Sequence, residues 1–327
     1  MYNIKILGTG KKIPIKIINN HDLEKIIYKN DEWIYNKTGI KTRHIIKDTN
    51  EYINLITESA IEAIKNSKLN YNDINLVILA TSTPTNLFGG VSNIISKLNI
   101  KNAISFDITL ACNGFNIAFY TAYQYIKNGT CTNALIIGAD CLSRWVDWSD
   151  YKTSILFGDG AGAVVIGRSN DIGYGFIKYY YKQDCSKHNI LNINVKEKEN
   201  IINNICVKNN YYDLMYMNGR EVFNFVIDNI PSFIIESLEQ EKLSINDIKY
   251  IIPHQANKNI LNLIAEKLNI SQDKILSNIE KYGNTSSASI PILLQETIEN
   301  NIFIKGDLIL LLGFGAGMSS SIIIFKY

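Results

Sequence analysis

Two stretches of the chain, 174 residues apart, share one pattern of residues. Positions 69–79 and 243–253 each contain a leucine, then Asn-Asp-Ile, then an apolar tail rich in residues that favour strands. A second similarity joins the glycine runs at 158–162 and 313–317, which are 155 residues apart and each lead into β-branched residues. Chance similarity is the alternative, but two matches in the same order favour an internal duplication.

The duplication predicts two halves, at 1–170 and 171–327. The unequal offsets predict an insertion of roughly 19 residues in the first half, and 141–153 is its expected place. Each half alternates helical and strand patterns, which is typical of an α/β fold with a largely parallel sheet. We therefore expect two sheets packed back to back, with helices between them.

Composition excludes several classes of function. The chain of 327 residues has 46% hydrophobic residues, 20% charged residues and a net charge of +2, which is typical of a globular protein and gives no reason to expect nucleic acid as a partner. No apolar run approaches the ~18 residues of a membrane span, and the N-terminus does not resemble a secretion signal. Five unevenly spaced cysteines do not predict a disulfide framework, so a reducing cytoplasm is the simplest location.

Metal and nucleotide sites find little support in the sequence. Only Cys185 and His188 are spaced like metal ligands, and no second pair accompanies them, so we predict no metal site. The glycine run at 158–162 leads into a strand pattern, whereas a dinucleotide fingerprint leads into a helix. Gly8 and Gly10 lack the remaining residues of a phosphate loop. We interpret both runs as tight turns where backbones pack closely.

Cys112 lies where a predicted strand (103–108) turns into a predicted helix (114–126). Unpaired amide groups at a helix N-terminus favour the thiolate, the form of cysteine that attacks acyl groups. Taken alone, Cys112 is more simply an inert buried residue. Two residues far along the chain change that interpretation.

The duplication relates His254 and Asn284 to Cys112. Position 254 corresponds to position 80, the end of the apolar run 76–80, so His254 should follow a strand at the edge where open α/β sheets place their sites. Position 284 corresponds closely to position 112, and Asn284 likewise precedes a predicted helix at 290–300. Singly, His254 could be a buried, satisfied histidine and Asn284 a turn residue. Their joint arrangement with Cys112 favours a common site.

Several motifs resemble the β-ketoacyl-acyl-carrier-protein synthase III family of the thiolase-like superfamily. They are Ala-Cys-Asn-Gly-Phe around Cys112, His-Gln-Ala-Asn from His254, Tyr-Gly-Asn-Thr-Ser-Ser-Ala-Ser around Asn284, Asp-Glu-Trp-Ile with Thr-Gly-Ile-Lys-Thr-Arg-His, Phe-Gly-Asp-Gly-Ala-Gly, Gly-Arg-Glu-Val-Phe and the final Gly-Phe-Gly-Ala-Gly. The resemblance runs from about residue 5 to the C-terminus, and it implies a five-layered αβαβα fold with two pseudo-symmetric halves and a homodimer.

The resemblance also implies the chemistry. Cys112, His254 and Asn284 form a catalytic triad in which Cys112 takes an acyl group from a thioester. His254 and Asn284 then hold a malonyl thioester as it loses carbon dioxide, and the resulting enolate attacks the acyl-cysteine to give a β-ketoacyl product. Backbone N–H groups of Cys112 and Ala316 form the oxyanion hole. No cofactor is implied, because coenzyme A or carrier-protein thioesters are the substrates.

Substrate contacts are implied by the same resemblance. Trp33 would stack on the adenine of coenzyme A with Lys37 near its phosphates, although Trp33 could equally be a packing residue, and Phe88 would reach into the acyl pocket of a dimer partner. Further substrate-binding candidates lie in the family motifs: Tyr151, Phe157, Arg220, Phe223, Ala256, Asn257 and Phe314.

Departures from the family pattern bear on the substrate. Tyr151 stands where the family commonly has an arginine, and a tyrosine can stack but brings no charge, so the choice between coenzyme A and carrier protein stays open. Basic residues for docking an acidic carrier protein could come from 182–198, which is otherwise a solvated loop. We predict a specialised member, from a secondary-metabolite pathway, that forms carbon–carbon bonds. The alternatives are acyl transfer to a hydroxyl or amine without loss of carbon dioxide, and a silent partner subunit, against which the intact triad argues.

Overall fold

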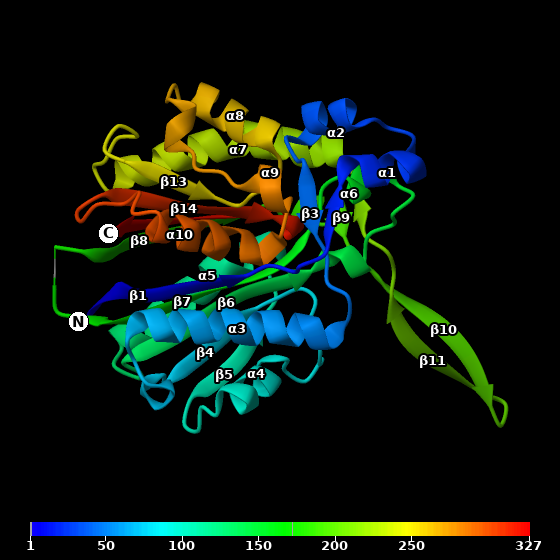
Figure 1. Ribbon diagram of the computed structural model, residues 1–327, viewed down its shortest axis with the longest axis horizontal. Helices are drawn as coiled ribbons and strands as arrows, with labels where there is room; N and C mark the ends of the chain where they lie inside the picture. Colours follow the sequence, from blue (N-terminus) through cyan, green and yellow to red (C-terminus); the bar gives the residue numbers. More distant parts are fainter. Residues whose placement is uncertain (1, 172) are drawn as a thin grey trace.

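Five layers make up the computed structural model, which describes residues 2–171 and 173–327. Helices cover the outer face of each of two sheets, and two further helices lie between the sheets (Figure 1). The predicted αβαβα arrangement is confirmed. Within the described residues, no helix is long and apolar enough to cross a bilayer.

The first sheet has the strand order β1-β7-β6-β4-β5, and all its strands precede residue 170. β4 pairs in parallel with β5 and β6, whereas β7 is antiparallel to both β6 and β1. The strands are β1 (Asn3–Lys12), β4 (Leu76–Ala80), β5 (Ile104–Ile108), β6 (Asn133–Cys141) and β7 (Asp159–Ser169).

The second sheet repeats this plan with the order β13-β14-β15-β8. β13 and β14 are parallel, and the other two pairings are antiparallel. On the free side of β13, Ile251 forms an isolated parallel bridge with Ile275, where the first sheet has β5. The strands are β8 (Gly175–Gln183), β13 (Tyr250–Pro253), β14 (Leu308–Gly315) and β15 (Ser319–Lys326).

The prediction of largely parallel sheets is wrong, because both sheets are mixed. Helices cover both faces of each sheet, so antiparallel strands such as β7 and β15 are apolar on both sides. Such strands give the same continuous apolar run as parallel strands, and the run does not encode strand direction.

The two halves differ most in one connection. Residues 142–158 join β6 to β7 and include the short helix α6 (Tyr151–Ser154), whereas only residues 316–318 join β14 to β15. The extra residues lie where the sequence predicts them. They are fewer than expected because the first glycine run opens β7, whereas the second closes β14 and forms the turn after it.

Gly8 and Gly10 are not in a turn. Both lie inside β1, where a side-chain carbon would come within 2.3 Å of the carbonyl oxygens of Ala63 and Ser59 on the neighbouring helix. The predicted close packing is present, and the predicted turn is wrong. Glycine at these positions lets the first sheet lie directly against that helix.

The central layer consists of α5 (Gly114–Lys127) and α10 (Ser289–Glu299). Phe115 and Phe119 of α5 are fully buried in a hydrophobic cluster that also contains residues of both sheets, such as Ile78 and Leu311. The outer helices are α3 (Thr49–Ser67) and α4 (Val91–Leu98) on the first sheet, and α7 (Gly219–Gln240) and α8 (Lys258–Lys267) on the second. One core therefore runs through both halves.

Smaller elements surround the end of the molecule where β4 and β13 finish (Figure 1). They are β2 (Ile17–Asn19), β3 (Thr42–His44), α1 (Asn20–Ile27), α2 (Asp31–Thr38), β9 (Leu191–Asn192), β12 (Tyr216–Met217) and α9 (Ile279–Tyr282). A long hairpin of β10 (Val195–Ile202) and β11 (Ile205–Tyr212) projects from the same end. The predicted solvated loop at 182–198 is thus partly strand.

Candidate active site

Cys112 lies in a single 3₁₀ turn (Ala111–Asn113) between β5 and α5. The flanking strand and helix are those that the sequence predicts. Ala111 has a left-handed φ of 44°, so the chain turns sharply just before the thiol. The side chain is 6% exposed and faces a pocket.

The second half approaches Cys112 through Gly315, at the end of β14. A side-chain carbon at Gly315 would lie 2.8 Å from Cβ and 3.4 Å from Sγ of Cys112. Real side chains do not come this close, so glycine is required if the thiol is to stay where it is. Ala316, the next residue, lines the same pocket as Cys112.

The expectation that the helix N-terminus leaves Cys112 as a thiolate is wrong for the free protein. Burial raises the pKa of the Cys112 thiol to about 12, and the hydrogen bond from Ser286 only partly opposes this effect. Desolvation is the largest influence on this pKa, and among the described residues no cation is close enough to the sulfur to offset it. The resting group is a thiol that must lose its proton during attack.

His254 directly follows β13, as the duplication predicts. Its amide donates to the carbonyl of Leu312 at 2.7 Å and so extends the parallel ladder to β14. The ring is 1% exposed and meets Phe314 edge to face, with centroids 5.3 Å apart. Burial lowers the pKa of His254 to about 3, so the imidazole is neutral.

Asn284 follows α9 and a glycine turn. Gly283 has a φ of 67°, and its neighbour Asn284 pairs with the chain at Phe157: the Asn284 amide donates to Leu156 at 2.9 Å, and the Asn284 carbonyl accepts from Gly158 at 3.0 Å. The side chain is 5% exposed. Backbone contacts on both sides therefore fix the position of this residue.

Ser286 connects the three predicted catalytic residues. Its hydroxyl donates to Sγ of Cys112 at 3.5 Å, and its amide donates to Oδ1 of Asn284 at 2.9 Å. Its carbonyl accepts from the Ser289 hydroxyl at 2.8 Å, and that hydroxyl lies 2.7 Å from Nδ1 of the His254 ring. The structure thus links Cys112, His254 and Asn284 through the turn that carries Ser286 and Ser289. Ser286 was not predicted from the sequence, although a run of serines that leads into an apolar helix signals buried hydroxyls that need partners.

Ser289 is a second missed residue. Its hydroxyl has one proton and two acceptors within reach, the carbonyl of Ser286 at 2.8 Å and Nδ1 of His254 at 2.7 Å. If it donates to Nδ1, the ring proton is on Nε2. If it donates to Ser286, the ring proton is on Nδ1 and Nε2 can accept a proton. The hydroxyl can therefore support either neutral tautomer.

A pocket of about 870 Å³ opens at Cys112. Ser286, Ala316 and Phe157 line it near the sulfur, and its walls are mostly apolar: Leu87, Phe88, Val91, Phe106, Leu142, Trp145, Leu191, Ile193, Tyr212 and Met215. His254 and Asn284 are not among the described residues that line it: Asn284 is connected to Cys112 through Ser286, and His254 through Ser289 and Ser286. The volume and the apolar walls suit an acyl chain.

Phe88 projects from the rim of this pocket. It is 98% exposed, and its neighbour Leu87 is 76% exposed. An apolar pair this open to solvent is unusual on the surface of a monomer.

Trp33, in the first turn of α2, and Tyr151, at the start of α6, come together. Their rings meet edge to face with centroids 5.7 Å apart, and Nζ of Lys29 lies 5.3 Å from the Trp33 ring and 5.7 Å from the Tyr151 ring. Lys29 was not predicted from the sequence, and it brings to this pair the positive charge that Tyr151 lacks.

The remaining candidates lie near α7 and α8. The carbonyl of Lys37 accepts a hydrogen bond from Asn257 at 3.0 Å, which ties α2 to the start of α8. Arg220 is exposed in the first turn of α7. Phe223 and Ala256 are partly buried and pack against the hydrophobic cluster that α7 and α8 form with the second sheet. In the part of the chain that is described, no group of three His, Cys, Asp or Glu lies close enough to hold a metal ion.

Comparison with known proteins agrees with this geometry. Residues 106–185 match the family described as 3-oxoacyl-[acyl-carrier-protein] synthase III, and residues 238–327 match its C-terminal part. The β-ketoacyl-[acyl-carrier-protein] synthase III of Trichodesmium erythraeum is 40% identical over 326 residues, which is 99% of this chain and 98% of that protein. The corresponding protein of Prochlorococcus marinus strain NATL2A is 42% identical over an alignment that covers 99% of this chain and 96% of that protein.

A solved structure is similarly close. The 3-oxoacyl-[acyl-carrier-protein] synthase III of Aquifex aeolicus superimposes with a TM-score of 0.89 at 38% identity, over 99% of this chain and 100% of that one. The chain therefore belongs to the β-ketoacyl-[acyl-carrier-protein] synthase III family and is an acyltransferase of the condensing type.

Proposed function

We propose that this protein loads an acyl group on Cys112 and condenses it with a malonyl thioester, with loss of carbon dioxide. The observation that supports the proposal is the turn at the end of the apolar pocket, where Ser286 contacts Cys112 and Asn284 and Ser289 links Ser286 to the His254 ring. A thiol, an imidazole and an amide held around one turn are what the two steps need.

The first step is acyl transfer. Sγ of Cys112 attacks the carbonyl carbon of an acyl thioester, and the bond from that carbon to the donor sulfur breaks. The proton of the Cys112 thiol passes through neutral His254, in its tautomer with a free Nε2, to the departing thiolate. Amides of Cys112 and Ala316 stabilise the tetrahedral oxyanion.

The second step is condensation. A malonyl thioester binds with its thioester carbonyl oxygen against N–H groups of His254 and Asn284, now with the ring proton on Nε2. The bond to the carboxylate breaks, carbon dioxide leaves, and the two donors stabilise the enolate oxygen. The enolate carbon attacks the acyl carbon, Cys112 leaves as the thiolate, and the thiolate takes up a proton from solvent to restore the resting thiol. Acyl transfer to a hydroxyl or amine is not favoured, because the named relatives are synthases of β-ketoacyl products.

Partners follow from the same proposal. The relatives are named for acyl carrier protein, so we assign a carrier-protein thioester to the malonyl substrate. Trp33, Tyr151 and Lys29 are the contacts for a coenzyme A donor, and the exposed Phe88 is the contact for a second copy of the chain in a homodimer. A cytoplasmic location and a specialised secondary-metabolite pathway stay predictions.

Intact-mass measurement tests the acyl-enzyme. The protein should gain the mass of one acyl group after incubation with acyl-coenzyme A or acyl-carrier protein, and Cys112→Ala should abolish the gain. Cys185→Ala, which removes an exposed thiol, is the matched control and should keep it. Release of labelled carbon dioxide from carboxyl-labelled malonyl thioester then tests condensation. Acyl loading without such release would contradict the proposal.

A further inference from the structure

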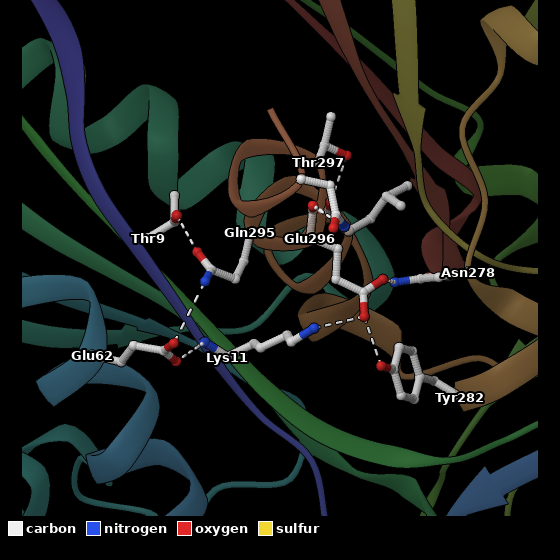
Figure 2. A network of polar contacts seen from close by, with 10 residues as sticks. Thr9, Lys11, Glu62, Asn278, Tyr282, Gln295, Glu296 and Thr297 are labelled. Carbon is white, nitrogen blue, oxygen red and sulfur yellow. Dashed lines mark hydrogen bonds and ion pairs between the residues drawn. The ribbon is translucent and has the colours of Figure 1, made fainter. Parts of the chain in front are cut away.

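Glu296 on α10 receives hydrogen bonds from three directions (Figure 2). One carboxylate oxygen accepts from Nζ of Lys11 at 2.6 Å and from the Tyr282 hydroxyl at 2.6 Å, and the other accepts from Nδ2 of Asn278 at 2.9 Å. The side chain is 15% exposed, so these partners are not exchanged freely for water. The proposed reaction steps assign no role to this cluster.

Two of these donors mark the ends of α9. Asn278 is the residue that precedes the helix, and Tyr282 is its last residue. Gly283 and Asn284 follow directly. One carboxylate therefore fixes both ends of the short helix whose continuation carries the proposed enolate donor.

Lys11 connects this anchor to the first half. It lies on β1, and its amide donates to Glu62 on α3 at 2.8 Å. The Gln295 side chain, next to Glu296, bonds to Glu62 at 3.5 Å and also accepts from Thr9. Figure 2 shows these side chains bridging from β1 and α3 to α10. The position of α9 is thus set relative to the sheet that also carries Cys112.

The charge on Glu296 belongs to this arrangement. Burial alone raises the pKa of its carboxyl, but the hydrogen bonds from Lys11, Tyr282 and Asn278 outweigh burial and hold the pKa below its usual range. Three donors aimed at two oxygens require an ionised acceptor.

The far side of the active-site turn has its own anchor. Buried Asp140 accepts from the amide of Ser287 at 3.0 Å and from its hydroxyl at 2.7 Å. Ser286, which touches Cys112, is next to this anchor. Loosening α9 therefore shifts Asn284 more than it shifts Ser286 or the thiol.

We propose that Glu296 is a positioning residue that acts through α9 to hold Asn284 in place for the decarboxylation step. The proposal rests on the proposed function, in which Asn284 stabilises the enolate. It predicts that the two half-reactions respond differently to loss of the Glu296 contacts.

Two variants test this role. Tyr282→Phe removes one contact and leaves the Lys11–Glu296 ion pair, and Glu296→Gln removes the charge at nearly constant shape. Both should lower carbon dioxide release from carboxyl-labelled malonyl thioester roughly tenfold to a hundredfold, because small misplacements of an orienting group have effects of this size. Both should keep the rate of acyl loading on Cys112, followed by intact mass, within about twofold of the parent.

Glu58→Gln is the matched control. Glu58 forms an exposed ion pair with Lys12, the neighbour of Lys11, and lies outside the group of Lys11, Asn278 and Tyr282 that bonds to Glu296, so neither rate should change. Equal losses in both half-reactions would assign Glu296 a purely structural role and overturn the proposal, as would unchanged carbon dioxide release in both variants. Asn284→Ala distinguishes failure of the Glu296 proposal from failure of the proposed function. If this variant releases carbon dioxide at the parent rate, the proposed function of Asn284 itself is wrong.

Discussion

At the scale of single residues, burial determines the charge of the proposed catalytic groups. It raises the pKa of Cys112 to about 12 and lowers that of His254 to about 3, so both are neutral near pH 7. A neutral pair avoids two buried charges in the resting protein. It also means that thiolate forms only as the proton moves away during attack.

The neutral state of His254 has a measurable effect on stability. Between its ordinary pKa of 6.5 and its folded value of about 3, the unfolded chain binds a proton that the folded chain does not. This contribution is complete above pH 6.5 and is lost as the pH falls toward about 3, at about 1.4 kcal/mol per pH unit. Urea unfolding across this range should show the parent losing stability relative to His254→Asn.

The control for this measurement is Ser232→Ala. Ser232 is exposed on α7 and carries no titratable group, so its replacement should leave the pH dependence of the unfolding free energy unchanged. A constant difference between the parent and His254→Asn from pH 7 to about pH 4 would contradict the prediction.

At the scale of elements, the β10–β11 hairpin differs from every other strand pair. Nearly all its residues are exposed, including Ile201, Ile202 and Ile205 near its tip. The two residues between the strands, Asn203 and Asn204, have φ values of 50° and 63°. This is the conformation of a two-residue hairpin turn, for which asparagine is suited. The base of the hairpin differs from the tip, since Tyr212 contacts Trp145 in the wall of the pocket.

Removal of the hairpin should leave the fold intact. Val195 and Tyr212 are paired, so Asn-Gly can replace residues 196–211 and close the shortened strands. Because few of the deleted side chains are buried, the melting temperature should change by less than about 3 °C. Ile230→Ala, which opens a cavity in α7 at a fully buried position, is the comparison and should be clearly destabilising. A large loss of stability in the deletion would contradict this picture.

The sequence predicts elements better than partners. Periodicity gives β5, α5 and α10, and the duplication gives the places of His254 and Asn284. The sequence does not predict strand direction, because a strand that is covered on both faces is apolar throughout in either direction. Nor does it give Glu296 and its partner Lys11, since nothing local marks an ion pair between residues 285 positions apart.

At the scale of the whole molecule, the two halves share one core. The cluster around α5 and α10 contains buried residues of both sheets, and Asn116 of α5 donates to the carbonyl of Leu311 in β14 at 3.2 Å. Separating the halves would expose the inner faces of both sheets. The boundary predicted near residue 170 therefore divides a repeat: each half has a hydrophobic cluster of its own on the outer side of its sheet, and the two halves share the central cluster.

Unfolding should accordingly be a single transition. The three tryptophans, Trp33, Trp145 and Trp148, all lie in the first half, so their fluorescence reports mainly on that half and on its contact with residues such as Tyr212. Far-ultraviolet circular dichroism reports on the helices and strands of both halves. The two signals should give the same urea midpoint. Two separate midpoints would show that the halves unfold independently.

The two connections between matching strands differ in length, and residues of both line the pocket at Cys112. The long segment after β6 supplies Leu142 and Trp145 as walls, while the three-residue turn after β14 supplies Ala316 at the sulfur. The two connections thus contribute to the same pocket, the long one with wall residues and the short one with a residue beside Cys112. We therefore expect each polypeptide to carry one acyl group at a time, although the chain consists of two similar repeats.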